Sequence, residues 1–357
     1  MSTVAVLAGD GIGPEVTRAA VRVLRAVRPD VRCEEVEVGG AAMERGDPPL
    51  PARARHLCER SVAILFGAVG LPQYEGLPLE ERPEHALFTL RHSFDLFANL
   101  RPVRVYPGLE PASNLKPAVI EGLDFIVVRE LTSGIYFGQP KELRMTEGGE
   151  EAVDTMYYSA AQIERIARVA FALASSRRSR VTSVDKQNIL ATSGLWRRVV
   201  SDVARDYPNV ALDHLLVDNA SMQLIRRPKD FDIILTENMF GDILSDEAAM
   251  LTGSVGNLPS ASLGTGISSG PVFGMYEPIS GTAPDIAGRD IANPTAAILS
   301  AALLLRHSLA DENGARRIEN AVERSFAAGA RTADLREQGA PSLTTTAFTD
   351  VVIDHLK

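Results

Sequence analysis

Short apolar runs alternate along the chain with longer segments in which apolar residues recur at helical spacing. Four apolar runs predict buried strands, at residues 4–8, 62–69, 125–128 and 231–235. Between and after them, helical periodicity predicts helices around residues 163–173, 195–203 and 316–331. This alternation is typical of an α/β fold with a largely parallel sheet flanked by helices.

Glycine and proline interrupt this pattern at a few places. The first predicted strand leads into GDGIGPE at residues 9–15, where the glycine spacing and Pro14 do not fit the Rossmann dinucleotide fingerprint. A tight strand-to-helix turn, with Pro14 in the first helical turn, explains these residues. Gly and Pro also cluster at residues 67–78 and 253–278, which predicts long loops or interdomain crossings, and residues 146–152 predict a surface turn.

Composition and charge narrow the class of protein. The chain has 357 residues, 45% of them apolar, and a net charge of −9, so we expect about two domains and no basic surface for nucleic acid. The longest apolar stretch, residues 296–305, is too short to span a bilayer. Cys33 and Cys58 show no metal-binding spacing, and residues 1–11 show no signal peptide. We therefore expect a soluble, cytoplasmic protein.

Three carboxylates form a candidate metal site. Asp242 and Asp246 in FGDILSDEA would lie one turn apart on the same face of a helix, where two like charges repel unless a cation lies between them. Asp218 precedes them in VDNASMQL. Ligands that offer only oxygen suit Mg²⁺ or Mn²⁺ rather than zinc. A solvated helix face explains the same spacing, so the residues alone leave both interpretations open.

Three arginines lie in apolar surroundings. Arg91, Arg101 and Arg129 occur in FTLRHSF, FANLRPV and FIVVREL. A buried guanidinium group needs an anionic partner, because an unpaired buried charge is costly. Salt bridges within the chain are one explanation. Bidentate binding of substrate carboxylates is the other, and a dicarboxylate would account for more than one arginine.

Three further polar residues have both a structural and a functional interpretation. Tyr136 in GIYFG either packs at a strand end or acts as an acid. Lys186 in VTSVDKQN either pairs with Asp185 on the surface or acts as a base with a lowered pKa. Asp285 in GTAPDIAGRDIANP either caps a helix or accepts hydrogen bonds from a ribose diol.

Long motifs along the chain together resemble the 3-isopropylmalate dehydrogenase family, within the isocitrate and isopropylmalate dehydrogenase superfamily. They are GDGIGPEV, LFANLRP, VRELTSGIYFG, SVDKQN, VDNASMQL, NMFGDILSDEA, GSVGNLPSASLG and APDIAGRDIANP. The motifs run from Gly9 to Pro294, and the helices predicted after them fit as well, so the resemblance covers essentially the whole chain.

The resemblance implies roles for individual residues. Asp242 and Asp246 would bind the metal from one subunit, and Asp218, with Lys186, would come from the partner of a homodimer with shared active sites. The arginines would clamp the malate carboxylates, with Lys186 as base and Tyr136 as acid. The implied substrate-binding residues are Arg91, Arg101, Arg129, Asp218, Glu84, Leu87, Phe88 and Ile189. The implied cofactor-binding residues are Asn188, Glu277, Gly281, Asp285, Ile286 and Asn293.

The resemblance also implies a reaction and a domain division. The reaction would be the oxidative decarboxylation of 3-isopropylmalate to 2-oxo-4-methylpentanoate in leucine biosynthesis, with NAD⁺ and Mg²⁺ or Mn²⁺. NAD⁺ is expected because Asp285 would repel the 2′-phosphate of NADP⁺. The fold would not be a Rossmann fold. Residues 1–98 and 254–357 would form a large cofactor-binding domain, and residues 99–253 a small domain with the dimer interface and an arm.

Two departures from the family leave the substrate's side chain open. Phe88 stands where Leu is usual, and Ile189 stands where Val is common. Both residues add bulk near the substrate's side chain, so another 3-substituted malate is an alternative substrate. In the other interpretation, Phe88 turns its ring into the core and leaves the pocket unchanged. Homoisocitrate, isocitrate and tartrate or malate dehydrogenases are the alternative activities, although Glu84 disfavours an extra substrate carboxylate. A catalytically inactive regulatory homologue is a different class, and the complete set of Asp, Lys and Tyr residues argues against it.

Overall fold

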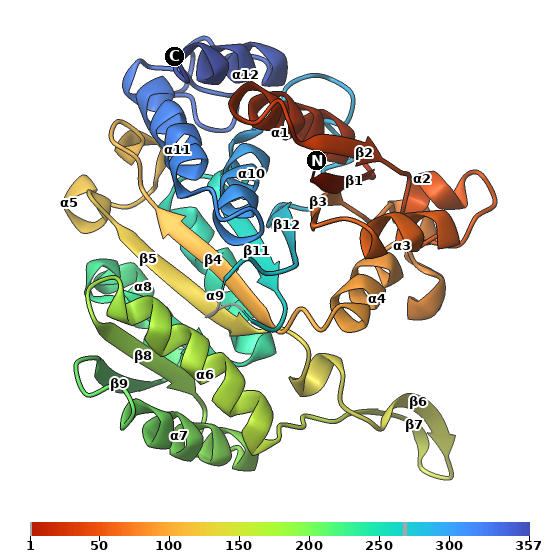
Figure 1. Ribbon diagram of the computed structural model, residues 1–357. Coiled ribbons are helices and arrows are strands. Elements are labelled where there is room, and N and C mark those ends of the chain that lie inside the picture. Colours follow the sequence, from red (N-terminus) through yellow and green to blue (C-terminus); the bar gives the residue numbers. More distant parts are fainter. Residues whose placement is uncertain (1, 267–269) are drawn as a thin grey trace.

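The structure is a computed structural model that describes residues 2–266 and 270–357. Its centre is a ten-stranded sheet in the order β2-β1-β3-β12-β11-β4-β5-β10-β8-β9 (Figure 1). The strands are β1 (Thr3–Gly9), β2 (Arg32–Glu35), β3 (Ala63–Ala68), β4 (Ala98–Arg104), β5 (Asp124–Glu130), β8 (Arg180–Asp185), β9 (Ala211–Leu216), β10 (Ile233–Thr236), β11 (Pro259–Leu263) and β12 (Gly274–Pro278). The pairings β12–β11, β11–β4 and β4–β5 are antiparallel, and the remaining pairings are parallel.

Helices pack on the sheet and supply most of the remaining core. They are α1 (Gly13–Val27), α2 (Gly40–Met43), α3 (Ala52–Glu59), α4 (His85–Ser93), α5 (Pro117–Ile120), α6 (Ala160–Ser175), α7 (Ala191–Ala204), α8 (Val217–Arg226), α9 (Asn238–Leu251), α10 (Thr295–His307), α11 (Glu312–Ala327) and α12 (Thr345–Asp354). In Figure 1, α1, α10, α11 and α12 gather at one end of the molecule, and α6 and α7 lie at the other. Helix α10 is buried over almost its whole length, which explains its continuous apolar sequence.

Most of the predicted elements are confirmed. The four apolar runs form β1, β3, β5 and β10, and the three periodic segments form α6, α7 and α11. The GDGIGPE turn joins β1 to α1, with Pro14 in the first turn of the helix. Every residue of β3 is buried, as its unbroken apolar sequence predicts. The prediction of a mostly parallel sheet holds toward both edges, whereas the centre is antiparallel.

The long loop predicted for residues 253–278 was wrong for much of that segment. Strands β11 and β12 form there and pair with each other in the middle of the sheet, while residues 267–269 lie outside the described part of the chain. Pro259 is tolerated because it is the first residue of its strand. Gly274 is required by close packing, since a Cβ atom there would lie 2.7 Å from Leu263. Glycine and proline were therefore signs of tight packing at these positions rather than of a loop.

A two-stranded hairpin projects from the body of the molecule (Figure 1). It consists of β6 (Lys141–Thr146) and β7 (Gly149–Asp154), which pair only with each other. The surface turn predicted for residues 146–152 is therefore shorter than expected, because most of that segment is strand. Within residues 2–266 and 270–357, no helix has both the length and the apolar character needed to cross a membrane.

Candidate active site

One cavity of about 270 Å³ lies where β3, β5 and β12 end, beside α4 and α9. The structure brings nine predicted site residues together in its lining. They are Leu87, Phe88, Arg91, Arg101, Arg129, Tyr136, Asp242, Glu277 and Gly281. Residues that lie far apart in the sequence thus form one site, and its three arginines outnumber the two carboxylates of Asp242 and Glu277, which favours a bound anion.

Arg129 is the most constrained of the three arginines. It ends β5, where it is 2% exposed, and its Nε and Nη2 atoms donate to Oδ1 of Asn238 at 3.0 and 2.7 Å. Its Nη1 atom lies 2.5 Å from Oδ1 of Asp242. Burial, together with the charge of Arg101, lowers the pKa of Arg129 to about 9. A second anion in the cavity would therefore stabilise this guanidinium group further.

Arg101 and Arg91 complete the cationic wall. Arg101 donates from Nε to Asn99 at 2.8 Å and from Nη1 to Ser245 at 2.6 Å. Burial lowers its pKa, although the nearby charge of Asp242 opposes that effect. Arg91 pairs with Glu277 at 3.0 Å, and its buried Nε atom has no hydrogen-bond partner. An unsatisfied buried donor of this kind favours a bound acceptor such as a carboxylate.

Asp242 links the arginines to Tyr136. Its Oδ1 atom faces Arg129 and Arg101, while its Oδ2 atom accepts a hydrogen bond of 3.1 Å from the Tyr136 hydroxyl. Burial would raise the pKa of Asp242, but the two guanidinium groups outweigh that effect and lower it. Burial and the charge of Asp242 raise the pKa of Tyr136. The phenol therefore keeps its proton at neutral pH, which is the state an acid requires.

The carboxylates on α9 suit a hard divalent cation. Asp246 follows Asp242 by one turn, remains largely exposed and lies 3.5 Å from Arg101. Both side chains offer only oxygen, which fits Mg²⁺ or Mn²⁺. Among the residues that the structure describes, no group of three or more His, Cys, Asp or Glu side chains is arranged to hold a metal.

Lys186 and Asp218 lie apart from this cavity. Lys186 follows β8, Asp218 is in the first turn of α8, and Nζ of Lys186 lies 2.5 Å from Oδ1 of Asp218. The hydrogen bond from Lys186 lowers the pKa of Asp218. The neighbouring Asn188 and Ile189 are exposed, with 73% of Ile189 accessible. A single chain thus holds the predicted site residues in two separate groups.

The predicted nucleotide loop follows β12. Asp285 is exposed, Ile286 packs partly against the core, and both belong to a series of turns before α10. Asn293 is already engaged: its amide donates to Asn257 and Asp334, and its Oδ1 atom accepts from the Thr295 backbone. Its observed role is to shape the start of α10, and a contact with the cofactor stays a prediction.

The glycine-rich turn after β1 supports this loop. The Ile12 amide donates to the Thr282 carbonyl oxygen at 2.8 Å. Gly11 adopts a φ of +58°, and a Cβ atom there would lie 2.0 Å from the Thr282 oxygen. Asp10 accepts backbone hydrogen bonds from Gly40, Ala41 and Gly70, which ties together the loops after three neighbouring strands. GDGIGPE therefore positions loops through its backbone, as a tight turn rather than a dinucleotide fingerprint.

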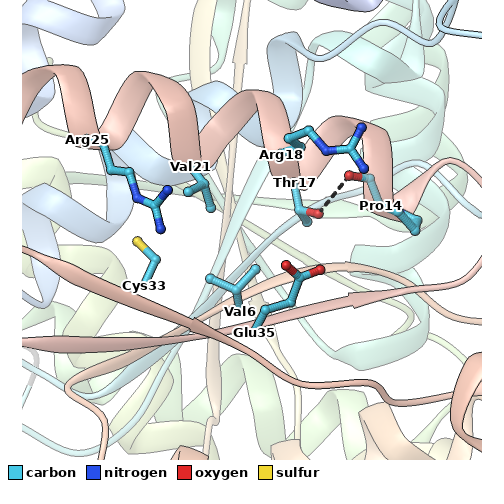
Figure 2. Close-up of a pocket in the computed structure, with 8 residues that line it drawn as sticks. All are labelled: Val6, Pro14, Thr17, Arg18, Val21, Arg25, Cys33 and Glu35. Carbon is cyan, nitrogen blue, oxygen red and sulfur yellow. Dashed lines mark hydrogen bonds between the residues drawn. The ribbon is translucent and has the colours of Figure 1, made fainter.

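A smaller cavity lies between α1 and the edge strand β2, far from the predicted site residues in sequence. It is lined by Val6, Pro14, Thr17, Arg18, Val21, Arg25, Cys33 and Glu35 (Figure 2). The guanidinium group of Arg25 points toward the Cys33 thiol, but burial outweighs its effect and raises the pKa of that thiol (Figure 2). A thiol that keeps its proton is a poor nucleophile, so this cavity offers no comparable chemistry.

The model of one protein family, described as isocitrate/isopropylmalate dehydrogenase, matches residues 3–352. The chain belongs to this family. The 3-isopropylmalate dehydrogenase of Symbiobacterium thermophilum is 53% identical over 99% of this chain and 98% of its own length. That of Bordetella avium is 52% identical over 99% of both chains. This chain is therefore identical at more than half of its residues to relatives that match it over nearly their full length.

Solved structures in the family share the fold. A crystal structure of isocitrate dehydrogenase from Methylococcus capsulatus superposes with a TM-score of 0.89 at 32% identity and covers 100% of this chain and 99% of its own. A β-decarboxylating dehydrogenase from Thermococcus kodakarensis gives a TM-score of 0.80 at 36% identity, with 100% and 96% covered. The prediction of the isopropylmalate dehydrogenase-like fold is therefore confirmed.

Sequence analysis missed the residues that hold the arginines. Asn238 fixes Arg129, and Asn99 and Ser245 fix Arg101. One signal could have found Asn238, because it precedes Asp242 by four residues and so extends the helix face of Asp242 and Asp246. Asn99 and Ser245 carry no comparable pattern, since their contacts depend on how the sheet and α9 pack.

Proposed function

We propose that the chain catalyses the NAD⁺-dependent oxidative decarboxylation of 3-isopropylmalate to 2-oxo-4-methylpentanoate, a step of leucine biosynthesis. The observation that carries this proposal is the convergence of Arg91, Arg101 and Arg129 on one cavity that also contains Tyr136 and Asp242. Three guanidinium groups suit a small dicarboxylate, and the relatives that share half of the sequence are 3-isopropylmalate dehydrogenases.

In this proposal the arginines orient the malate part of the substrate. Asn238 and Asn99 hold Arg129 and Arg101 in place, so both guanidinium groups are arranged before the substrate enters. The unsatisfied Nε atom of Arg91 gains an acceptor when a carboxylate binds. Guanidinium groups fixed in this way would hold C2 and C3 of the substrate in a defined position in the cavity.

The metal would be held by Asp242 and Asp246, completed by Asp218 of the partner subunit. When bound, a divalent cation supplies positive charge that stabilises negative charge on the C2 oxygen. The observed donor set fits this role, since Asp242 is kept ionised by two arginines and Asp246 remains accessible. Mg²⁺ or Mn²⁺ is therefore the proposed ion.

Proton transfer would use two residues. Lys186 of the partner subunit would accept the proton of the C2 hydroxyl through its neutral amine, and the contact of 2.5 Å with Asp218 would fix where its Nζ atom lies. Tyr136 would donate a proton to C3 after CO₂ has left, a role that its raised pKa supports. The hydride of C2 would pass to NAD⁺, the chemistry that this cofactor would supply when bound.

NAD⁺ is proposed rather than NADP⁺ because of Asp285. Its carboxylate is exposed on the loop after β12, and no hydrogen bond to it is found within the described part of the chain. Such a carboxylate accepts hydrogen bonds from the free hydroxyls of a ribose and repels a 2′-phosphate. Gly281, Ile286, Asn293, Glu277 and Asn188 are proposed to complete the cofactor site.

A homodimer would bring the two groups of residues together. Helices α8 and α9 lie side by side, linked by a hydrogen bond of 2.8 Å from Ser221 to Glu247, and they expose large apolar side chains. These are Met222 and Ile225 on α8 and Ile243 and Met250 on α9. The hairpin exposes Leu143 and Met145 as well. Exposed apolar side chains on the two helices that carry Asp218 and Asp242 support the proposal of a subunit interface there.

Two proposed domains meet at the cavity. Residues 1–98 and 254–357 contribute Arg91 and Glu277, whereas residues 99–253 contribute Arg129 and Tyr136. The ten-stranded sheet runs through both parts. A site between two domains allows the cavity to close around the substrate and exclude water, which strengthens the electrostatic contacts inside it.

The test is NADH formation with Mn²⁺ and a panel of malates that carry no substituent, a 3-methyl group, a 3-isopropyl group or the extra carboxylate of isocitrate or homoisocitrate. We expect the highest kcat/KM among these with 3-isopropylmalate, equal amounts of NADH and CO₂, and a preference for NAD⁺ over NADP⁺. A preference for a tricarboxylate, or NADH without CO₂, would contradict the proposal.

A further inference from the structure

A fully buried carboxylate lies next to Arg129, on the opposite face of β5 from the active-site cavity. Glu130 is the last residue of β5 and is 0% exposed, so it cannot touch a molecule that binds in the cavity. Nη2 of Arg165 lies 3.8 Å from its Oε1 atom, which is too long for a hydrogen bond. An ionised group is costly to bury unless it is well hydrogen-bonded, so the partners of Glu130 explain why it is tolerated.

These partners belong to the turn that follows β5. The Oε1 atom of Glu130 accepts hydrogen bonds from the backbone amide and the hydroxyl of Thr132, at 3.1 and 3.0 Å. Its Oε2 atom accepts a hydrogen bond of 2.9 Å from the buried Ser133 amide. On the other side of the turn, Asn238 donates to the Ser133 carbonyl oxygen at 2.9 Å. Unpaired backbone groups are costly in a buried turn, so both oxygens of the carboxylate support this conformation.

The turn joins two residues of the proposed active site. Tyr136 comes three residues after Ser133, at the end of a short 3₁₀ helix at Gly134–Tyr136. Cζ of Arg129 lies 5.8 Å from the centroid of the Tyr136 ring, and the Tyr136 hydroxyl lies 3.1 Å from Asp242. The conformation of the turn therefore sets where the proposed acid lies relative to the proposed substrate clamp.

We propose that Glu130 is a positioning residue for Tyr136 and thereby sets the rate at which C3 is protonated after CO₂ has left. The inference rests on the proposed function, since it concerns the last step of that reaction. In this step the enolate takes up the phenol proton at C3, and the resulting phenolate regains a proton from water. A displaced hydroxyl slows the transfer, because the acid must lie within reach of the atom that it protonates. Hydride transfer and decarboxylation come earlier and do not use this proton.

Two substitutions weaken the turn at residues outside the cavity lining. Glu130→Gln keeps the shape of the side chain but leaves one acceptor oxygen for three donors. Thr132→Val removes the hydroxyl that donates to Glu130 and accepts from Arg165 at 2.8 Å, whereas Thr132→Ser keeps a hydroxyl there. Glu164→Gln is the matched control, because Glu164 is exposed on α6 and pairs with Arg168. Circular dichroism checks that each variant is folded.

The measurement is NADH formation from 3-isopropylmalate with Mg²⁺, followed by stopped flow from the first turnover to the steady state. If the Tyr136 hydroxyl is displaced, each active site forms its first NADH at the wild-type rate and then waits for protonation. We therefore expect Glu130→Gln to show a burst of NADH and a steady-state rate per active site that is lower by about tenfold. Thr132→Val should show a smaller fall, and Thr132→Ser and Glu164→Gln should match the wild-type chain.

A purely structural role of Glu130 would give a different result, because loss of folded protein lowers the first-turnover and steady-state signals in proportion. The inference is overturned if the two signals fall together, or if Glu130→Gln and Thr132→Val keep the wild-type steady-state rate. Thr132→Val decides alone if Glu130→Gln does not fold. If the wild-type chain forms no NADH from any 3-substituted malate, the proposed function itself has failed.

Discussion

Asn238 shows how a single neutral side chain organises the cationic wall. Its Oδ1 atom accepts from two nitrogens of Arg129, and its Nδ2 atom donates to the carbonyl oxygens of Leu131 and Ser133. The residue is fully buried, so these hydrogen bonds have no competition from water. A neutral acceptor fixes the guanidinium group without adding a second negative charge to that of Asp242.

Replacing Asn238 tests this positioning role. Asn238→Ala would leave two Arg129 nitrogens without an acceptor, and hydrogen bonds to a charged group contribute about 1.5–3 kcal/mol each. We expect kcat/KM for 3-isopropylmalate to fall by about 100-fold, mainly through KM, because the clamp is no longer oriented. Asn320→Ala on the exposed face of α11 is the control. Wild-type kinetics in a folded Asn238→Ala variant would show that Arg129 needs no such support.

At this scale the sequence predicted the charged residues but not the residues that hold them. Arg91, Arg101 and Arg129 could be recognised because charged groups in apolar runs are unusual, and the structure places all three in one cavity. Asn238 and Ser245 are ordinary polar residues of a helix, and only the packing of α9 against β5 and β4 reveals what they contact. The surface pair of Lys186 with Asp185 was wrong, because Asp185 is buried and pairs with Arg197, whereas Lys186 contacts Asp218.

Helix α9 presents its site residues because it packs very closely on β5. Gly241 makes this approach possible: a Cβ atom there would lie 2.6 Å from Cγ and 2.8 Å from Cβ of Arg129. The same helix carries Asp242 and Asn238, so the distance between helix and strand sets the geometry of the whole Arg129 cluster. A small change in that distance would disturb several contacts at once.

Gly241→Ala should therefore reduce activity although alanine favours helices. The added methyl group must displace the Arg129 side chain or the helix, and we expect kcat/KM to fall by more than tenfold, since small misplacements of substrate-binding groups are costly. Gly194→Ala in α7 is the matched control, because no atom lies within 4 Å of its Cβ position. That control should gain about 0.5–1 kcal/mol of stability and keep full activity. Unchanged kinetics in Gly241→Ala would contradict the close-packing argument.

Helix α10 ends on a histidine that favours the neutral state. Burial, with the nearby charge of Arg306, lowers the pKa of His307 from 6.5 to about 4. As the pH falls, the imidazole of His307 therefore takes up a proton in the unfolded chain before it does so in the folded chain. Neutral His307 therefore makes its full contribution to the free energy of unfolding above pH 6.5. This contribution is lost as the pH falls toward 4, and the total loss is about 3 kcal/mol.

This prediction is measured by urea unfolding at pH 7.5 and pH 5. The wild-type chain should lose more stability between the two values than His307→Gln, which cannot be protonated. His56→Gln serves as the control, because His56 is exposed near the end of α3. If the wild-type chain and His307→Gln lose equal stability over this range, His307 does not contribute to the pH dependence.

Hydrophobic patterning predicted the elements better than glycine and proline content did. The apolar run at residues 62–69 predicted a strand buried on both faces, and β3 confirms this. Residues 259–263, by contrast, are small and lack a strong apolar signal, yet they form β11 at the centre of the sheet. Their pairing with β4 and β12 joins residues distant in sequence, and no local pattern encodes such long-range contacts.

At the scale of the whole molecule, the proposed site residues of one chain form two separate groups. The cavity with Arg129, Tyr136 and Asp242 is one group, and the Lys186–Asp218 pair is the other. Exposed apolar residues lie on α8 and α9, the helices that carry Asp218 and Asp242. A twofold dimer through these helices would complete two equivalent sites, each with residues from both subunits.

The most direct test of such a shared site is complementation between inactive subunits. Asp218→Ala and Asp246→Ala are each expected to be nearly inactive as homodimers, because every site then lacks one metal ligand. When the two variants are co-expressed, a mixed dimer contains one site with all of its ligands. Random assembly should therefore restore about a quarter of wild-type NADH formation from 3-isopropylmalate. Activity no higher than that of either parent, in preparations shown to contain mixed dimers, would contradict a site built from two chains.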